Sequence, residues 1–333
     1  MLSPFTSAIL SWYDRNARQL PWRQTAAPYA IWLSEIILQQ TRVEQGRAYW
    51  ERFIAAYPTV EQLDAASEDE VLKLWQGLGY YSRARNLHFA ARQIVQNGQF
   101  PTTYEGIRQL KGVGDYTAAA IASFAFNLPY ATVDGNVYRV LARHFGIDTP
   151  INTTDGKKLF TRLAQELLPE KLAGRFNQAM MDFGATCCTP QSPHCGQCPL
   201  VETCEALRTN RVQALPVKQK KLKIRHRHFI YIYIRCGTQV ALHRRGKGDI
   251  WQGLWEPYMV ESDHLPSFKG VFTSLATGVK HVLTHQVILA DFYRLEVPER
   301  PSLPEDYVWI EEESVADYAI PRLVQRLFEY LEE

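Results

Sequence analysis

The sequence lacks a long hydrophobic run: no stretch approaches the roughly 20 consecutive apolar residues that a membrane-spanning helix needs. It also lacks a basic start that leads into an apolar segment, because the early apolar residues Phe5, Ile9, Leu10 and Tyr13 recur at helical spacing instead. The sequence therefore predicts neither membrane insertion nor secretion, and we expect a cytoplasmic protein.

An excess of charge of one sign is also missing. The 333 residues include 37 lysines and arginines against 35 acidic residues, a net charge of +2 that neither requires nor excludes a nucleic-acid partner. With 46% hydrophobic and 22% charged residues, the chain has the composition of a protein that buries a core, and its length allows two domains.

Strict alternation of apolar and polar residues is almost absent before residue 208. Apolar residues there recur every three or four positions, between short turns that contain Gly, Pro or Asn. We predict an all-α domain over residues 1–207. Its clearest helices are expected at residues 6–16, 29–40, 69–78, 85–95, 115–126 and 174–185.

A basic segment, residues 208–227, follows this helical part and has few residues suited to a core. It is predicted to be a solvated linker between domains, which does not prevent it from following a phosphate backbone. Its basic residues are Arg208, Arg211, Lys218, Lys220, Lys221, Lys223, Arg225 and Arg227.

From residue 228 the hydrophobic period becomes two, which predicts strands. Residues 228–236 and 238–245 are expected to pair around a turn near Gly237, with further strands at 285–297 and 306–311 and one or two closing helices over 314–333. Residues 228–333 are therefore predicted to form a small α+β domain.

Four of the six cysteines, Cys188, Cys195, Cys198 and Cys204, follow the spacing C-x6-C-x2-C-x5-C. Four thiolates in one short segment suit either zinc or an iron–sulfur cluster. Structural zinc sites usually present two close ligand pairs, and only one C-x2-C pair exists here, so the longer arms favour the larger cluster. Cys187 could replace Cys188 as a ligand. The site is expected mainly to tie down a loop, with redox or sensing roles left open.

A turn with two glycines, Gly112-Val113-Gly114, precedes the helix expected at 115–126. Glycine permits positive φ and close approach of another backbone, and the unpaired amides at a helix start suit a phosphate group. The same turn could instead serve only to pack two helices together.

Two acidic residues stand out. Asp134 directly precedes an apolar helix, where it could be an N-cap. Glu35 lies among large apolar residues, where a carboxylate is costly to ionise unless it is paired. Glu35 is therefore either a charge on the helix surface or an acid with a shifted pKa.

Taken together, these features resemble the helix-hairpin-helix DNA glycosylases of the endonuclease III superfamily, and within it the MutY-type adenine DNA glycosylases. The resemblance extends over both halves of the chain. Besides the cysteine loop, it rests on the segments LPWR (20–23), SEIILQQT (34–41), GLGYYSRARNL (77–87), LKGVGDYTA (110–118) and VDGNVYRV (133–140).

This resemblance implies a base-excision repair enzyme that hydrolyses the N-glycosidic bond of adenine mispaired with 8-oxoguanine or guanine. Glu35 would protonate the departing base and activate water, Asp134 would stabilise the sugar cation, and Tyr116 and Asn136 would support them. Relatives with lyase activity carry a lysine at position 116 for a Schiff base. Tyr116 cannot form one, so a monofunctional enzyme is expected.

The resemblance further implies one 4Fe-4S cluster on Cys188, Cys195, Cys198 and Cys204, and duplex DNA as partner of a monomeric, nucleoid-associated protein. Gly112, Val113 and Gly114 would contact the DNA backbone. The residues expected to bind the extruded adenine or the opposite lesion are Arg18, Trp22, Arg23, Gln40, Thr41, Leu78, Gly79, Tyr80 and Gln178.

The C-terminal half resembles the Nudix-like domain of this family, which reads the 8-oxoguanine strand. Thr284 and His285 match a Phe-Ser-His loop of relatives, with Leu283 in place of the aromatic residue. A hydroxyl is kept at position 284, although a plain turn is the alternative. Pyrophosphate hydrolysis is not expected, because the glutamate-rich helix that would hold magnesium is missing after residue 228.

Two other functions remain open at this point. A bifunctional glycosylase for pyrimidine lesions is opposed by Tyr116 and by the extra C-terminal domain. A catalytically silent damage-binding protein is opposed by the presence of both acids, Glu35 and Asp134, at matching positions.

Overall fold

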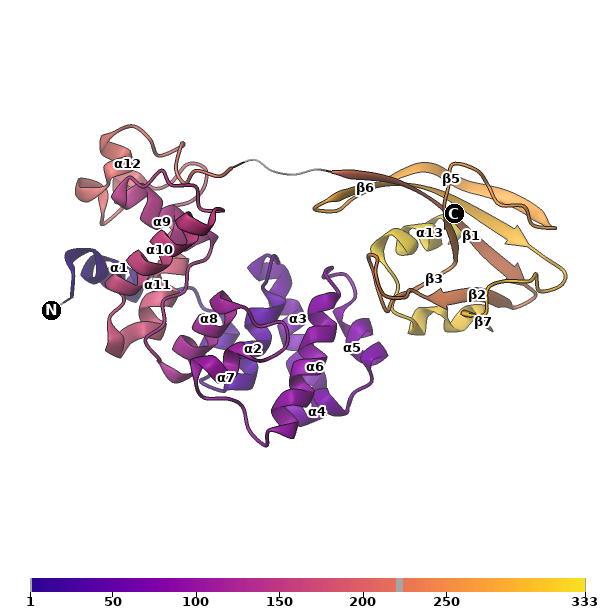
Figure 1. The fold of residues 1–333 in the computed structure, drawn as a ribbon, viewed down its shortest axis with the longest axis horizontal. Helices are drawn as coiled ribbons and strands as arrows, with labels where there is room; N and C mark the ends of the chain where they lie inside the picture. Colours follow the sequence, from indigo (N-terminus) through magenta and orange to yellow (C-terminus); the bar gives the residue numbers. More distant parts are fainter. Residues whose placement is uncertain (1, 220–223, 333) are drawn as a thin grey trace. The chain divides into compact units, whose positions relative to one another are not determined.

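The computed structural model describes residues 2–219 and 224–332. The chain divides into two units (Figure 1), one of Met1–Asp64 and Phe89–Lys220 and the other of Ala65–His88 and Lys221–Glu333. Helix α5 (Glu68–Trp75) therefore belongs to the second unit, and α6 (Ser82–Gln96) crosses the boundary. No helix in the described ranges is long and apolar enough to cross a membrane.

The described part of the first unit contains helices and turns and no strand, so the all-α prediction is confirmed. Its helices are α1 (Pro4–Asn16), α2 (Pro28–Ile37), α3 (Val43–Ala56), α4 (Val60–Ala65), α7 (Tyr104–Arg108), α8 (Asp115–Phe126), α9 (Gly135–Phe145), α10 (Thr154–Leu167), α11 (Ala173–Thr186) and α12 (Glu205–Arg208).

Helix α11 is central to the first unit because it packs against α1, α8 and α9. Its buried Phe176, Met180 and Phe183 share a core with apolar residues of α1, α9 and α10. Two glycines let the helices approach closely: a Cβ at Gly174 would overlap the backbone carbonyl of Ser123 in α8, and one at Gly184 would lie 2.6 Å from Asn136 Cβ in α9.

The first part of the segment that was predicted to be a solvated linker is packed against the protein instead. Residues 208–219 pack on the first unit, where Leu215 is buried and the Arg143 guanidinium donates to its backbone carbonyl. The Ile151 amide also donates to the carbonyl of Val217. These backbone bonds, which composition does not reveal, fix a segment that is rich in charge. Lys220, Lys221 and Lys223 of the same prediction lie outside the described residues.

The domain boundary at residue 207 also differs from the division that the contacts give. Residues 65–88, expected in the helical domain, are grouped with the C-terminal half. Polar contacts tie them there: the Arg244 guanidinium lies 2.7 Å from the Asp69 carboxylate, and the Lys73 ammonium donates to the backbone carbonyl of Ala316. Helical periodicity predicts a helix but not its partner.

The second unit is built on one sheet of order β3-β2-β1-β6-β5, with β4 paired to β1 and β7 to β2. Only the β1–β6 pair is parallel among the described pairs. The strands are β1 (Arg225–Cys236), β2 (Gln239–Arg244), β3 (Trp255–Glu256), β4 (Tyr258–Glu261), β5 (Val271–Val282), β6 (Gln286–Glu296) and β7 (Tyr307–Glu311), followed by helix α13 (Arg322–Glu332).

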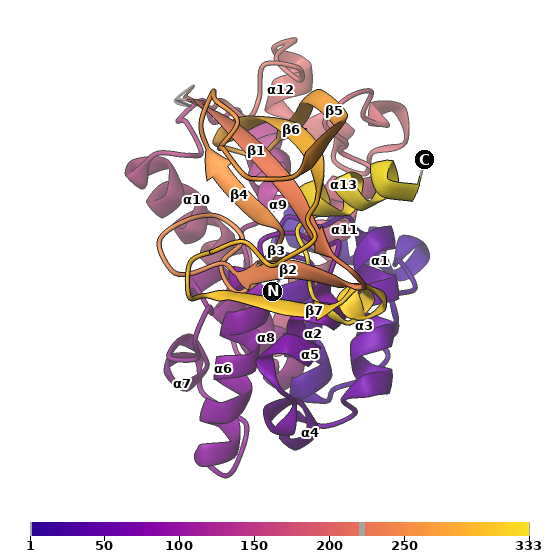
Figure 2. The same ribbon diagram turned by 90° about the vertical axis from the view of Figure 1, so that its right-hand side faces the viewer.

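Strand β1 shows why this part of the sequence alternates. Phe229, Tyr231 and Tyr233 face one side of the sheet, where the buried face of α13 covers them (Figure 2). The intervening isoleucines of β1 pack into a separate core on the other side. All four predicted strands (β1, β2, β6 and β7) and the closing helix are confirmed, whereas β3, β4 and β5 were not predicted.

The close approach at Gly174 yields a test of the helical core. Replacing Gly174 with alanine should destabilise the protein by about 1–3 kcal/mol, because the new Cβ must displace the α8 backbone. The measurement is thermal unfolding followed by circular dichroism. The control is Gly196→Ala, whose Cβ would meet nothing within 4 Å. Equal unfolding temperatures for the two variants would contradict the packing described.

Candidate active site

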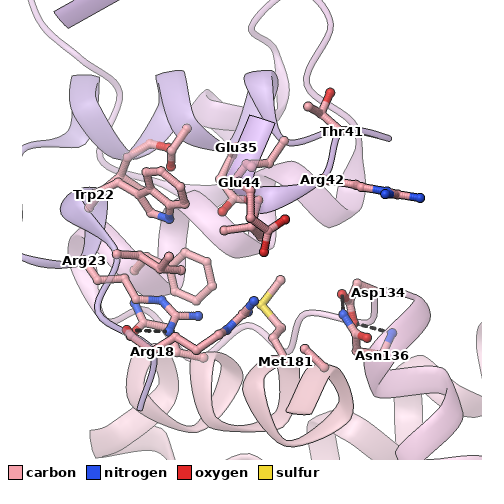
Figure 3. A pocket seen from close by; sticks show the side chains of 18 of the residues that line it. Arg18, Trp22, Arg23, Glu35, Thr41, Arg42, Glu44, Asp134, Asn136 and Met181 are labelled. Carbon is pink, nitrogen blue, oxygen red and sulfur yellow. Dashed lines mark hydrogen bonds between the residues drawn. The ribbon is translucent and has the colours of Figure 1, made fainter. Parts of the chain in front are cut away.

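The largest set of predicted site residues lies around one cavity of about 660 Å³ in the first unit. Figure 3 shows Arg18, Trp22 and Arg23 on one side of this cavity and Asp134 and Asn136 on the other. Glu35, Thr41, Tyr116 and Gln178 also line it. Segments far apart in the sequence thus bring nine of the predicted residues together: Arg18, Trp22, Arg23, Glu35, Thr41, Tyr116, Asp134, Asn136 and Gln178.

Glu35 reaches the cavity from α2, whose residues 30–37 are all buried. The side chain is only 8% exposed, so the alternative of a surface charge is wrong. Burial raises the pKa of Glu35 to about 7; the charge of Arg23 and a hydrogen bond from the Tyr116 hydroxyl oppose this rise, while the charge of Asp134 adds to it. Glu35 can therefore hold a proton at a higher pH than an exposed glutamate does.

Asp134 is the N-cap of α9, as the structural alternative predicted, and it also lines the cavity. Its Oδ1 accepts from the backbone N–H groups of Asn136 and Val137 at 2.9 and 2.8 Å, and its Oδ2 accepts from Asn136 Nδ2 at 2.8 Å. Burial raises the pKa of Asp134, although these hydrogen bonds favour the carboxylate. The cap thus fixes a carboxylate at the cavity wall.

Arg139 braces this cap from behind. Its guanidinium donates to Asn136 Oδ1 at 2.8 Å, to the backbone carbonyl of Gly184 at 2.6 Å and to that of Cys188 at 2.7 Å. The cysteine loop is therefore connected to Asp134 through two side chains. We missed Arg139 in the sequence, although its position one helical turn after Asn136 was a usable signal.

One predicted binding residue of the first unit, Gln40, lies apart from this cavity wall. Gln40 is not among its lining residues and has a left-handed backbone, with φ 57°, in the turn after α2. A non-glycine residue in this region costs free energy, and such residues are common at binding sites. Thr41, the next residue, does line the cavity.

The glycine turn lies between α7 and α8. Gly112 has a φ of 80°, a conformation that favours glycine, and Val113 is buried. Gly114 has an extended backbone, and a Cβ there would meet nothing within 4 Å, so the internal structure does not require glycine at this position. The first amides of α8 remain available to an outside group.

Leu78, Gly79, Tyr80, Thr284 and His285 line a different hollow, of about 530 Å³, in the second unit. The hydroxyl groups of Tyr80 and Thr284 are hydrogen-bonded. Tyr80 has φ 49° and is 46% exposed, while Thr284 lies in the turn between β5 and β6. The two predicted lesion-reading segments are therefore neighbours within this unit.

The four cysteines Cys188, Cys195, Cys198 and Cys204 line a small cavity of about 30 Å³. No three Cys, His, Asp or Glu side chains in the described ranges are arranged to hold one metal ion. Arg143 places a guanidinium nitrogen 3.4 Å from Cys188 Sγ, and a cation there favours a thiolate. The donor set fits an iron–sulfur cluster.

Family models match three parts of the chain. Residues 33–170 match the HhH-GPD superfamily of base excision DNA repair proteins, and residues 230–330 match a NUDIX domain. Residues 188–204 match the iron-sulfur binding domain of endonuclease III. The matched segment begins at Cys188, and the preference for an iron–sulfur site over zinc is confirmed.

Curated relatives include adenine DNA glycosylases. The Mus musculus protein is 44% identical over 229 residues, which cover 65% of this chain and 44% of the relative. The Buchnera aphidicola (subsp. Acyrthosiphon pisum) protein is 35% identical over 254 residues, covering 75% of this chain and 73% of the relative. The chain thus spans less than half the length of the mouse relative.

Among solved structures, a thermostable thymine-DNA glycosylase is similar in fold, with a TM-score of 0.58 and 32% identity. The match covers 62% of this chain and 95% of that one.

The burial of Glu35 yields a direct test. In protein labelled with carbon-13 at glutamate carboxyl groups, one carboxyl should titrate near pH 7 and disappear in a Glu35→Gln variant. Replacing Arg23 with methionine should move this titration to higher pH, because a nearby cation that favours the carboxylate is lost. A Glu35 midpoint at about 4.3, the value of an exposed glutamate, would refute the description.

Proposed function

The chain belongs to the adenine DNA glycosylase family, within the HhH-GPD superfamily, and on this premise we propose that it excises adenine paired with 8-oxoguanine or guanine in duplex DNA. The observation that carries the proposal is the pair of acids, Glu35 and Asp134, at one cavity that is large enough for a nucleoside. The target adenine would leave the base stack and enter this cavity.

Glu35 acts as the general acid. Adenine departs poorly as an anion, so a ring nitrogen must gain a proton as the bond to the sugar breaks. A carboxyl group with a pKa of about 7 can hold a proton near neutral pH and yet release it to a departing base. The resulting carboxylate then takes a proton from the attacking water.

Asp134 stabilises the positive charge that develops on the sugar. Its two hydrogen bonds from α9 backbone amides and the one from Asn136 hold the carboxylate before the reaction begins. Little reorganisation is then needed when the charge appears. Tyr116 supports the opposite wall through its hydrogen bond to Glu35.

The remaining predicted residues bind DNA. Arg18, Trp22 and Gln178 hold the extruded adenine, whereas Gln40 and Thr41 contact the DNA around it. The amides around Gly112, Val113 and Gly114 bind a backbone phosphate, and Gly114 leaves room for its approach. In the second unit, Leu78, Gly79, Tyr80, Thr284 and His285 read the strand that carries the lesion.

Cys188, Cys195, Cys198 and Cys204 would hold a 4Fe-4S cluster, because four thiolates are the usual ligand set of such a cube. The cluster would supply a rigid cross-link for the loop. The backbone carbonyl of Cys188, to which Arg139 donates, would then be fixed in place. Arg139 in turn donates to Asn136 Oδ1 and holds that side chain.

Glu35→Gln tests the acid. With enzyme in excess over a duplex that contains one A·8-oxoguanine pair, adenine release should slow by about 10²- to 10⁴-fold, while the dissociation constant for the duplex stays nearly unchanged. The control is Glu51→Gln, which removes a carboxylate that is about half exposed and paired with Arg47. A Glu35→Gln variant with near wild-type release would overturn the assignment.

A second test separates hydrolase from lyase. After reaction, the product strand should stay intact until alkali cleaves it at the abasic site, because Tyr116 cannot form an imine. Borohydride should therefore trap no more covalent protein–DNA adduct than in a reaction with undamaged duplex. Efficient trapping would indicate a lysine nucleophile and a bifunctional enzyme.

A further inference from the structure

Asp182 lies behind the wall of the catalytic cavity, on α11, and has no role in the reaction described so far. Its side chain is fully buried, and each of its two carboxylate oxygens accepts two hydrogen bonds. Oδ1 accepts from Arg18 Nε at 2.7 Å and from Arg23 Nη2 at 2.9 Å. Oδ2 accepts from Arg23 Nη1 at 2.7 Å and from the backbone N–H of Arg18 at 2.9 Å.

This geometry is that of an ionised carboxylate with two guanidinium partners. Burial alone would raise the pKa of Asp182, but the hydrogen bonds and charge of Arg23, together with the Arg18 amide and side chain, hold it below the ordinary value. The fork of Arg23 binds both oxygens, which fixes its orientation as well as its position. Arg18 and Arg23 themselves line the cavity.

Burial raises the pKa of Glu35, and among the groups that lower it the charge of Arg23 has the largest effect. The charged or titratable groups that share the cavity with Glu35 are Arg18, Arg23, Arg42, Glu44, Tyr116, Asp134 and Arg139. Without a counter-ion, the charge of Arg23, which has a largely buried side chain, would act on Glu35 unopposed. Asp182 is the described carboxylate that contacts both Arg18 and Arg23.

We propose that Asp182 is a positioning residue, which holds Arg18 and Arg23 in place and neutralises the charge of Arg23, so that Glu35 keeps its proton until adenine departs. The catalytic part of this inference rests on the proposed function. The effect of Asp182 on the titration of Glu35 concerns the protein alone, without DNA. A sequence search for catalytic acids does not find Asp182, since nothing in the segment AMMDFGA marks it.

The test is Asp182→Asn, which keeps the size of the side chain and removes its charge. The uncompensated Arg23 should favour the Glu35 carboxylate, and the carboxyl titration of Glu35 should move to lower pH by about one pH unit. Adenine release near pH 7 should then fall roughly fivefold and recover at lower pH, with duplex binding retained. An unmoved titration, or one moved to higher pH, overturns the proposal.

Two comparisons separate this role from a merely structural one. Asp64→Asn removes an equal charge from the pair with Arg92 and should leave the Glu35 titration unchanged. In an Arg23→Met background, Asp182→Asn should cause no further displacement, because Asp182 acts through Arg23. Additive displacements would contradict the proposal.

The comparison of Arg23→Met with the double variant also applies if Asp182→Asn alone does not fold. Leaving a buried arginine unpaired is strongly destabilising, so Asp182→Asn alone could fail to fold, whereas the double variant removes both charges of the Asp182–Arg23 pair. The proposal requires coincident Glu35 titrations in Arg23→Met and the double variant, and different ones overturn it. Since the titration needs no substrate, it remains decisive if the wild-type protein releases no adenine, which would refute only the proposed function.

Discussion

The proposed chemistry depends on the free-energy cost of ionising one carboxyl group inside an apolar helix. Glu35 lies in a run of buried residues, and this burial outweighs the charge of Arg23 and the hydrogen bond from Tyr116, so its pKa rises to about 7. In the proposed reaction Glu35 gives up its proton only when the base leaves. Its pKa must therefore be higher than that of an ordinary glutamate, but not so high that the group stays neutral. The charge of Asp134, at the other wall of the cavity, adds to the rise.

In the proposed reaction Asp134 has the opposite requirement, since it must carry a negative charge although burial raises its pKa. Its position as the N-cap of α9 supplies backbone donors, and Asn136 adds one more. Arg139 links this cap to the backbone carbonyl of Cys188, and Gly184 leaves space for Asn136. The cysteine loop therefore supports the cavity wall through Arg139 and Asn136, and it also lines the cavity at Pro190.

The sequence predicted much of this arrangement because several short segments carry their own signals. The apolar run around Glu35, the cap at Asp134 and the alternation of β1 are local patterns, and the structure contains all three. Long-range contacts have no local pattern in the sequence: Asp182 binds Arg18 and Arg23, which lie about 160 residues away in the chain. Strand β5 was missed because it is irregular, with bulges around Ala276 and mostly exposed residues. The packing of residues 208–219 was missed because it depends on backbone hydrogen bonds.

A crystal structure of the Asp134→Asn protein bound to a duplex with an intact A·8-oxoguanine pair would test the central claim most directly. The account predicts that adenine lies outside the base stack, with a ring nitrogen within hydrogen-bonding distance of the Glu35 carboxyl and the sugar facing residue 134. Adenine that remains stacked, or that binds in a different cavity with Glu35 out of reach, would contradict it.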